Sequence, residues 1–489
     1  MGNHGYSDCW LGTGLGKLFI LPRELAYLGV STPISQLLLP VVRSCHEHPM
    51  RNILWPFFSS KHSCAPPQHS TGAVVIPRYR SAMSSGTAGG AAAALYAATV
   101  STPAILGAVP DTVSEKSHWL RDKTGKGEAK GFVNPWESSH DFSFPEIFKA
   151  MVQHKFFSGN SQRPDTTPPT VSVTKPKFLP SRTSSQALRA IWLGHACSYI
   201  EFPSGLRVLF DPVFEDRCSP FSWLGHKRFT PRPCDISDIP IIDCVIISHS
   251  HYDHLSHPSI LEIHKHHPFV QFCVPKGLKK WFADCGIKNA VELDWWEDVD
   301  LTLSKPAGES PPTSGPASTH DITARVSCLP CQHTSARTPL DKSITLWASW
   351  SVSSGGKSVY FAGDTGYRAV PLVPKEVDDW GSEFAYLPIC PAFKQIGQLR
   401  GPFDLGLIPI GAYQPRHVLS PVHSNPYDSV EIFKDTKCKK AMGIHWGTWA
   451  IAEESVLEPP QLLKKAMAKS GLPETGVFDV CGIGESREF

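Results

Sequence analysis

The 489-residue sequence lacks a strong net charge, because 47 Lys and Arg residues nearly balance 45 Asp and Glu residues. Bulk charge therefore gives no support for a nucleic acid or another polyanion as a partner. The sequence also lacks the dense cysteine framework of a small disulfide-stabilised domain. Its 14 cysteines are scattered along a long chain, which is typical of free thiols in a reducing compartment.

Acidic residues are absent between His48 and Pro110, where Ser, Ala, Gly and basic residues are frequent. This composition is typical of an organelle transit segment, and equally of a disordered extension. Long apolar runs are scarce too. The one uncharged stretch long enough to cross a bilayer, residues 91–109, is rich in Ala and contains Pro103. We predict a disordered or targeting leader over residues 1–130, with residues 91–109 as a weak transmembrane segment or a flexible low-complexity segment.

From Gly131 the composition becomes globular, and we predict a single domain over residues 131–489. Short apolar, β-branched runs predict strands over residues 187–194, 198–202, 206–214, 244–248, 269–275, 290–297, 322–330, 344–352, 358–364, 404–410 and 439–447. Helical spacing of apolar residues predicts helices over residues 144–157, 258–267, 277–286 and 461–470. The first of these helices either packs on the core or faces a membrane. Many strands with helices between them predict a mixed α/β fold of two packed sheets. A polar insert over residues 304–320 predicts a disordered loop.

The most informative motif is SHSHYDHL, which directly follows an apolar strand and contains His249, His251, Asp253 and His254. Residues two apart in an extended chain point the same way, so His249 and His251 can share one ion. The turn then directs the next two side chains towards a second ion. Imidazole nitrogens and carboxylate oxygens are suitable ligands for Zn²⁺. Four residues are too few for two sites, so other segments must contribute ligands.

Three further candidates, His333, Asp364 and His445, each follow a predicted strand. A single His or Asp after a strand is usually a turn or capping residue. The ordered set of all seven residues changes that interpretation, since together they supply enough ligands for two metal ions.

At this point the sequence resembles the metallo-β-lactamase superfamily, through the motifs SHSHYDHL, CQHTSARTPL, FAGDTGY and GIHWGTW. Further motifs, among them GFVNPW, WLGHACSYIE, DPVFEDRCSP, KRFTPRPC and GPFDLGLIPIGAYQPR, resemble more narrowly the family of N-acyl-phosphatidylethanolamine-hydrolysing phospholipases D. The similarity runs from about Gly131 to near the C-terminus and covers nothing before residue 130. The resemblance implies an αββα sandwich of two mixed sheets with helices outside. The polar insert over residues 304–320 and extra residues over 368–391 depart from the family pattern. Because both lie in loops, these departures would affect substrate selection more than the metal site.

The resemblance also implies a role for each residue of the motifs. His249, His251 and His333 would hold one zinc ion, Asp253, His254 and His445 would hold the other, and Asp364 would bridge both. His423 matches a histidine near the substrate phosphate. His195 and Asp211 match positions beside the site, where they orient ligands or serve a structural role.

The implied activity is hydrolysis of N-acyl-phosphatidylethanolamine to N-acylethanolamine and phosphatidic acid. In the implied mechanism a hydroxide shared by two Zn²⁺ ions per subunit attacks phosphorus. Asp253 would accept or relay a proton, and His423 would assist the phosphate or the leaving group. A phospholipid substrate implies a membrane surface as partner, and the family implies a homodimer. The leader fits an intracellular, membrane-associated protein of the mitochondrial inner membrane.

Other functions remain open at this stage. No histidine is followed two residues later by lysine, so the paired HxKxxxxD motifs of other phospholipases D are absent and only a metal route fits. A nuclease, lactonase or β-lactamase would use the same fold and metals on another substrate. A non-catalytic scaffold would be expected to lose ligands, and all seven are present. A redox protein would place a di-iron site on the same residues.

Overall fold

The computed structural model describes residues 96–489, except residues 123, 126, 143–144, 147–148, 150–163, 183–184, 305–320 and 375–376. Three predicted features lie wholly or largely outside the described residues. They are the leader up to residue 95, the helix over residues 144–157 and the loop over residues 305–320.

The larger of two sheets contains eight strands in the spatial order β1, β10, β11, β12, β13, β14, β15 and β16. Their bounds are β1 (Ala97–Ser101), β10 (Asp298–Ser304), β11 (Ile322–Leu329), β12 (Ser349–Ser354), β13 (Lys357–Phe361), β14 (Phe403–Pro409), β15 (Cys438–Ile444) and β16 (Phe478–Asp479). Neighbouring strands are antiparallel from β1 to β13 and parallel from β13 to β16. The sheet is therefore mixed, as predicted.

The smaller sheet contains seven strands in the order β17, β4, β5, β6, β7, β8 and β9. Their bounds are β17 (Ser486–Glu488), β4 (Arg189–Gly194), β5 (Cys197–Glu201), β6 (Arg207–Phe210), β7 (Cys244–Ile246), β8 (Gln271–Pro275) and β9 (Ala290–Leu293). Strands β17 to β6 are antiparallel neighbours, and β6 to β9 are parallel. A separate hairpin joins β2 (Trp119–Leu120) and β3 (Gly131–Phe132).

The two sheets pack face to face, and strands β4 to β8 of the smaller sheet are buried on both sides. Successive residues of β6 show why, because Phe210 belongs to the core between the sheets and Leu209 to a second core on the outer face. The rings of Phe210 and Phe361 lie 4.7 Å apart across the first of these cores. Such double burial explains the long apolar runs that predict the strands.

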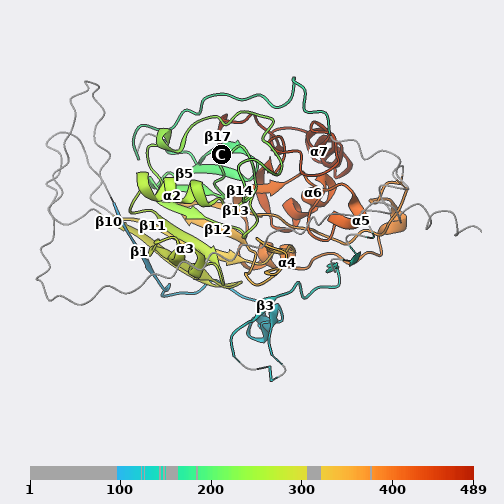
Figure 1. The fold of residues 1–489 in the computed structure, drawn as a ribbon, viewed down its shortest axis with the longest axis horizontal. Coiled ribbons are helices and arrows are strands. Elements are labelled where there is room, and N and C mark those ends of the chain that lie inside the picture. Colours follow the sequence, from blue (N-terminus) through green and yellow to red (C-terminus); the bar gives the residue numbers. More distant parts are fainter. Residues whose placement is uncertain are drawn as a thin grey trace, which may run out of the picture. The chain divides into compact units, whose positions relative to one another are not determined.

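Helices cover the outer faces of both sheets (Figure 1). Helices α2 (His257–His266) and α3 (Lys279–Asp284) contribute buried residues to the core outside the smaller sheet. On the larger sheet, α6 (Pro426–Asp435) packs on β14 and β15 and contacts α4 (Ala392–Leu399) and α7 (Glu458–Lys469). Shorter helical segments are α5 (Arg416–Leu419), η2 (Asp111–Glu115), η3 (Ile236–Asp238) and η4 (Ser382–Phe384). The layers thus follow the order helix, sheet, sheet, helix, which confirms the predicted sandwich.

The structure differs from the predicted leader at residues 96–130. Strand β1 lies inside the candidate transmembrane segment, and it pairs with β10 along its whole length. Farther along, Lys116, His118 and Trp119 all bond to the carboxylate of Asp294, at 2.9, 2.7 and 2.9 Å. An uncharged, Ala-rich run is compatible with an edge strand as well as with a membrane span, so its composition alone does not distinguish the two. Among the described residues, no helix combines the length and apolar content needed to cross a bilayer.

Candidate metal centre

The seven residues predicted as ligands lie just beyond the ends of strands in both sheets. Residues 249–254 follow β7, whereas His333, Asp364 and His445 follow β11, β13 and β15. Each of these candidate side chains is therefore placed by the segment that directly follows a strand. The distances between these side chains show that the ends converge on one site.

Three histidines form the first group. Nε2 of His249 lies 2.8 Å from Nδ1 of His251, which in turn lies 3.2 Å from Nε2 of His333. His249 and His333 are each 1% exposed, so water has almost no access to their rings. Three imidazole nitrogens that face one another at these distances fit a site for a cation.

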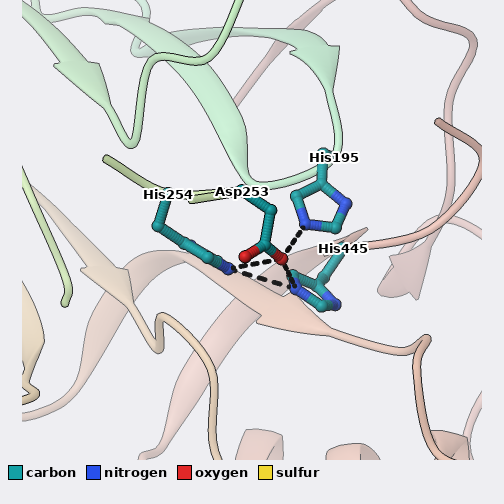
Figure 2. A group of neighbouring side chains, drawn as sticks. All are labelled: His195, Asp253, His254 and His445. Atoms are coloured by element: carbon teal, nitrogen blue, oxygen red, sulfur yellow. Dashed lines mark hydrogen bonds and ion pairs between the residues drawn. The ribbon is translucent and has the colours of Figure 1, made fainter. Parts of the chain in front are cut away.

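The second group surrounds the carboxylate of Asp253 (Figure 2). Oδ2 of Asp253 lies 3.3 Å from Nε2 of His254 and 3.5 Å from Nε2 of His445. Those two imidazole nitrogens are themselves 3.2 Å apart. Nε2 of His195 lies 2.9 Å from the same carboxylate oxygen. His195, which was predicted to lie beside the site, therefore contacts one of the predicted ligands directly.

Asp364 lies between the two groups. Its Oδ1 is 3.0 Å from Nε2 of His445, and its Oδ2 is 3.1 Å from Nε2 of His254. The same Oδ2 is 3.8 Å from Nε2 of His333 and 4.0 Å from Nε2 of His249. One carboxylate thus reaches both clusters, which is the arrangement expected of a bridging ligand.

The outward-facing nitrogen of several ligands is fixed by a second residue. Nδ1 of His254 donates to Oδ2 of Asp211 at 2.6 Å, and Nδ1 of His333 donates to the carbonyl of Val422 at 2.8 Å. Nδ1 of His249 lies 2.9 Å from Oγ of Ser248. Each contact orients an imidazole ring and directs Nε2 towards the site, as such partners do around protein-bound metals. Asp211 therefore contacts a predicted ligand, His254, directly.

Three non-glycine residues of the site have left-handed backbone conformations. They are His195 with φ 52°, Asp211 with φ 38° and His445 with φ 62°. Such conformations are uncommon for residues with a side chain and concentrate at functional sites. The turn at His195 is held in place because its N–H donates to Oγ1 of Thr448 and its carbonyl accepts from the N–H of His445.

His423 also belongs to this cluster, although it comes from the loop before α6. Its Nδ1 lies 3.8 Å from Oδ2 of Asp364, and its ring centroid is 5.1 Å from that of His333. The side chains of His423 and Asp253 are 15% and 16% exposed, whereas Asp364 is 2% exposed. His423 and Asp253, like His251, are therefore more exposed to solvent than the rest of the cluster.

The protonation preferences of these groups fit a site built for cations. Burial lowers the pKa of His249 and His333 well below the usual value, so both rings are neutral and able to bind a metal. Burial opposes charge at His445 as well, but Asp364 and Asp253 raise its pKa to about 9. The buried carboxylates thus require positive charge nearby, which a divalent cation would supply. Oδ1 of Asp364 and Nδ1 of His423 are also buried without a hydrogen-bond partner among the described residues.

Sequence reasoning missed several residues that position the site. The side-chain amide of Asn134 brackets His333, because it donates to the carbonyl of that residue and accepts from its N–H. Arg337 donates to the carbonyls of Ser250 and Leu255 at 2.8 and 2.9 Å and so holds the turn that contains the first ligands. Both lie inside quoted motifs, GFVNPW and CQHTSARTPL, and that location is the one signal that could have identified them.

Comparison with known proteins agrees with this geometry. A family model described as a β-lactamase superfamily domain matches residues 206–446, a span that contains all seven residues. N-acyl-phosphatidylethanolamine-hydrolyzing phospholipase D 1 of Caenorhabditis elegans is 33% identical over 352 residues, which cover 70% of this chain and 87% of that protein. The chain belongs to this phospholipase D family of the β-lactamase superfamily. It is a metal-dependent hydrolase.

Two further similarities were found. The mitochondrial N-acyl-phosphatidylethanolamine-hydrolyzing phospholipase D of Saccharomyces cerevisiae is 33% identical over 275 residues, which cover 56% of the hydrolase and 50% of the yeast protein. Among solved structures, the metallo hydrolase Igni18 of Ignicoccus hospitalis is 18% identical and gives a TM-score of 0.38. The match covers 62% of the hydrolase and 98% of Igni18.

Proposed function

We propose that this hydrolase cleaves N-acyl-phosphatidylethanolamine into N-acylethanolamine and phosphatidic acid, using two zinc ions per subunit. Water adds to phosphorus, the bond between phosphorus and the ethanolamine oxygen breaks, and one proton passes from the water to the leaving alkoxide. The observation that carries the proposal is the convergence of seven His and Asp ligands in a chain that is similar to a phospholipase with this activity along most of its length.

The donor set suits two cations. We propose that His249, His251 and His333 hold one ion. The other ion would be held by Asp253, His254 and His445, with Asp364 shared between the two. Such ions, when bound, activate water and offset the negative charge that develops on the phosphate. The near-complete burial of Asp364 and His445 would keep bulk water away from the ligands.

Asp253 is the proposed proton acceptor. It is the more exposed of the two ligand carboxylates, and His195 fixes its Oδ2 at 2.9 Å. A carboxylate held in one orientation at the solvent-facing side of the site can take the proton of the attacking water. His195 then acts as a positioning residue, because its Nε2 contacts the carboxylate of Asp253.

His423 is proposed to contact the phosphate or the departing alkoxide. Burial lowers its pKa to about 4, so its ring is neutral near pH 7. A neutral imidazole can donate a hydrogen bond from one nitrogen, and this side chain has the exposure needed to meet a substrate.

An apolar cavity beside His333 supports a lipid substrate. It has a volume of about 190 Å³, and its walls include Phe132, Phe142, Trp347 and Val418. Apolar walls next to a polar reaction centre suit a molecule with a charged headgroup and hydrocarbon chains. We propose that part of an acyl chain occupies this cavity.

The direct test is product analysis with and without metal. We expect purified protein to convert N-acyl-phosphatidylethanolamine into phosphatidic acid and N-acylethanolamine, as detected by mass spectrometry. A chelator should abolish the reaction, and added Zn²⁺ should restore it, because the proposed reaction needs water that a bound cation activates. Metal analysis of the protein as isolated would separate zinc from iron. Cleavage of RNA or a lactone, without cleavage of the phospholipid, would show that another hydrolase activity is correct.

We further propose a homodimer that associates with the mitochondrial inner membrane, directed there by the acid-poor leader. The yeast relative is described as mitochondrial, and this description and the composition of the leader support the location. We expect a fluorescent protein fused after residues 1–87 to accumulate in mitochondria, because basic, acid-poor segments act as transit sequences. Deletion of residues 2–87 from the full chain should abolish that targeting and leave strand β1 intact. An unchanged distribution of the deletion variant would refute the targeting role.

A further inference from the structure

Two loops carry exposed apolar side chains next to the candidate metal centre. The first, residues 217–227, is here called the tryptophan loop. Its Phe221, Trp223 and Leu224 are 47, 72 and 46% exposed. The second, residues 338–344, is here called the leucine loop, and its Leu340 and Ile344 are 90 and 52% exposed. Aromatic and aliphatic side chains gathered at such exposure usually mark a surface that contacts something apolar.

The tryptophan loop is attached to both sides of the metal centre. Just before it, Glu215 accepts hydrogen bonds from Ser256, the N-cap of α2, and from Ser259. The carbonyl of Asp216 accepts from Nε1 of Trp449, four residues after the ligand His445. The residues just before the loop therefore contact the start of α2, which follows His254, and the segment that follows His445.

The ends of this loop are joined, because Arg217 pairs with Lys227 through a β-bridge and donates to the carbonyl of Gly225. The loop is thus a closed projection that carries its apolar side chains away from the joined ends.

The leucine loop is attached to the same turn of ligands. Arg337, directly before it, donates to two carbonyls of residues 249–255, and its guanidinium lies 4.0 Å from the ring centroid of Tyr252. Ser343 lines the apolar cavity beside His333, as does Lys342. Both loops therefore flank the turn that contains His249, His251 and Asp253.

Within the tryptophan loop itself the charged residues, Arg217 and Lys227, are both basic. Between Asp216 and Asp235 there is no acidic residue, whereas Arg217, Lys227, Arg228 and Arg232 are all basic. Lys227 is exposed, so its charge faces outward beside the apolar tip, whereas Arg232 pairs with Asp235 at 3.4 Å. Apolar side chains with cations at their base complement a surface that has anionic groups above a hydrocarbon layer.

We propose that the tryptophan and leucine loops form one docking face for an anionic lipid bilayer. The face inserts Phe221, Trp223 and Leu224 among the headgroups and brings the metal centre against the membrane. The inference rests on the proposed phospholipid substrate, because such a substrate resides in a bilayer and must enter the site from it. An aromatic side chain suits this position, since its ring is apolar and its indole N–H can face the headgroups.

The test compares vesicle binding by the full chain and by a variant with Phe221→Ser, Trp223→Ser and Leu224→Ser. We expect the variant to bind phosphatidylcholine–phosphatidylserine vesicles at least about tenfold more weakly, because three apolar side chains no longer enter the bilayer. Lys227→Gln should weaken binding to these vesicles about fivefold and leave binding to pure phosphatidylcholine unchanged. Vesicles with brominated acyl chains should quench the tryptophan fluorescence of the full chain more than that of a Trp223→Phe variant.

Phe269→Ser is the matched control, because Phe269 is 52% exposed and lies beyond the C-terminal end of α2, away from the ligands. It should bind vesicles as the unmodified chain does. Every variant should hydrolyse a short-chain substrate that stays monomeric in water at the normal rate. Unchanged vesicle binding by the triple variant would overturn the docking face. So would a change from dimer to monomer with vesicle binding retained, since the loops would then be a protein interface. Loop-dependent vesicle binding without any phospholipid hydrolysis would support docking and refute the proposed reaction.

Discussion

Replacement of Asp253 by asparagine is expected to leave the protein folded and to lower kcat about 10³-fold. The carboxylate has two proposed roles, as a ligand and as the acceptor of a proton from water, and the amide can accept no proton. Loss of a general base alone lowers rates by about 10² to 10⁴. The fold should survive because Asp253 is part of a solvent-facing turn and its side chain is 16% exposed.

Three measurements on the purified variant separate these roles. Turnover of N-acyl-phosphatidylethanolamine, metal content and the melting temperature should be compared with those of the unmodified protein. Low turnover with full metal content would identify a proton acceptor, and low turnover with metal lost would identify a ligand. Asp284→Asn is the control, because this exposed carboxylate on α3 only pairs with Lys280. Near-normal turnover of the Asp253 variant would refute both roles.

The candidate ligands could be identified from the sequence because their pattern is local, and the structure brings their side chains together. His249, His251, Asp253 and His254 occupy six residues directly after a buried strand. Metal binding is the simplest reason for an apolar strand to be followed by three histidines and an aspartate. The distant ligands were predictable because each follows an apolar run, and strand ends are where a fully buried sheet can present polar groups. The same runs made the two-sheet architecture predictable.

Contacts between distant segments could not be predicted in the same way. The sequence indicates that His195 lies near the site, yet nothing local specifies that its ring contacts Asp253, 58 residues away. Strand β10 was missed because its alternating polar residues interrupt the apolar run that predicts a buried strand. Helix α6 was also missed, although Asn425 and Asp428 form a capping box that marks its start.

The clearest example of such long-range structure is a buried network of four charges. Oδ1 of Asp428 accepts from Nε of Arg368 at 3.3 Å, and Oδ2 lies 2.8 Å from Nη2 of Arg416. Nε of Arg416 also donates to Asp379 at 2.6 Å. The network joins the extra residues 368–391 to α5 and to the first turn of α6. The loop that carries His423 lies between those two helices.

Asp428→Asn is therefore expected to cost about 3–5 kcal/mol of unfolding free energy, because it leaves two buried guanidinium groups with a single carboxylate partner. Asp428 is 0% exposed, and its Oδ1 also accepts from the indole of Trp380 at 3.1 Å. Water cannot replace the lost charge at such a position. Urea unfolding of the full chain gives the difference, which is a large share of the stability of an ordinary domain.

Glu431→Gln on the same helix is the matched control. Its carboxylate pairs with Lys434 in a partly exposed contact, which is worth less than about 1 kcal/mol. Equal stabilities of the two variants would contradict the assigned network. We further expect the Asp428 variant to raise KM more than the control does. The first turn of α6 anchors the loop of His423, so loosening that turn should disturb contact with the phosphate before it disturbs ligands held by the strand ends.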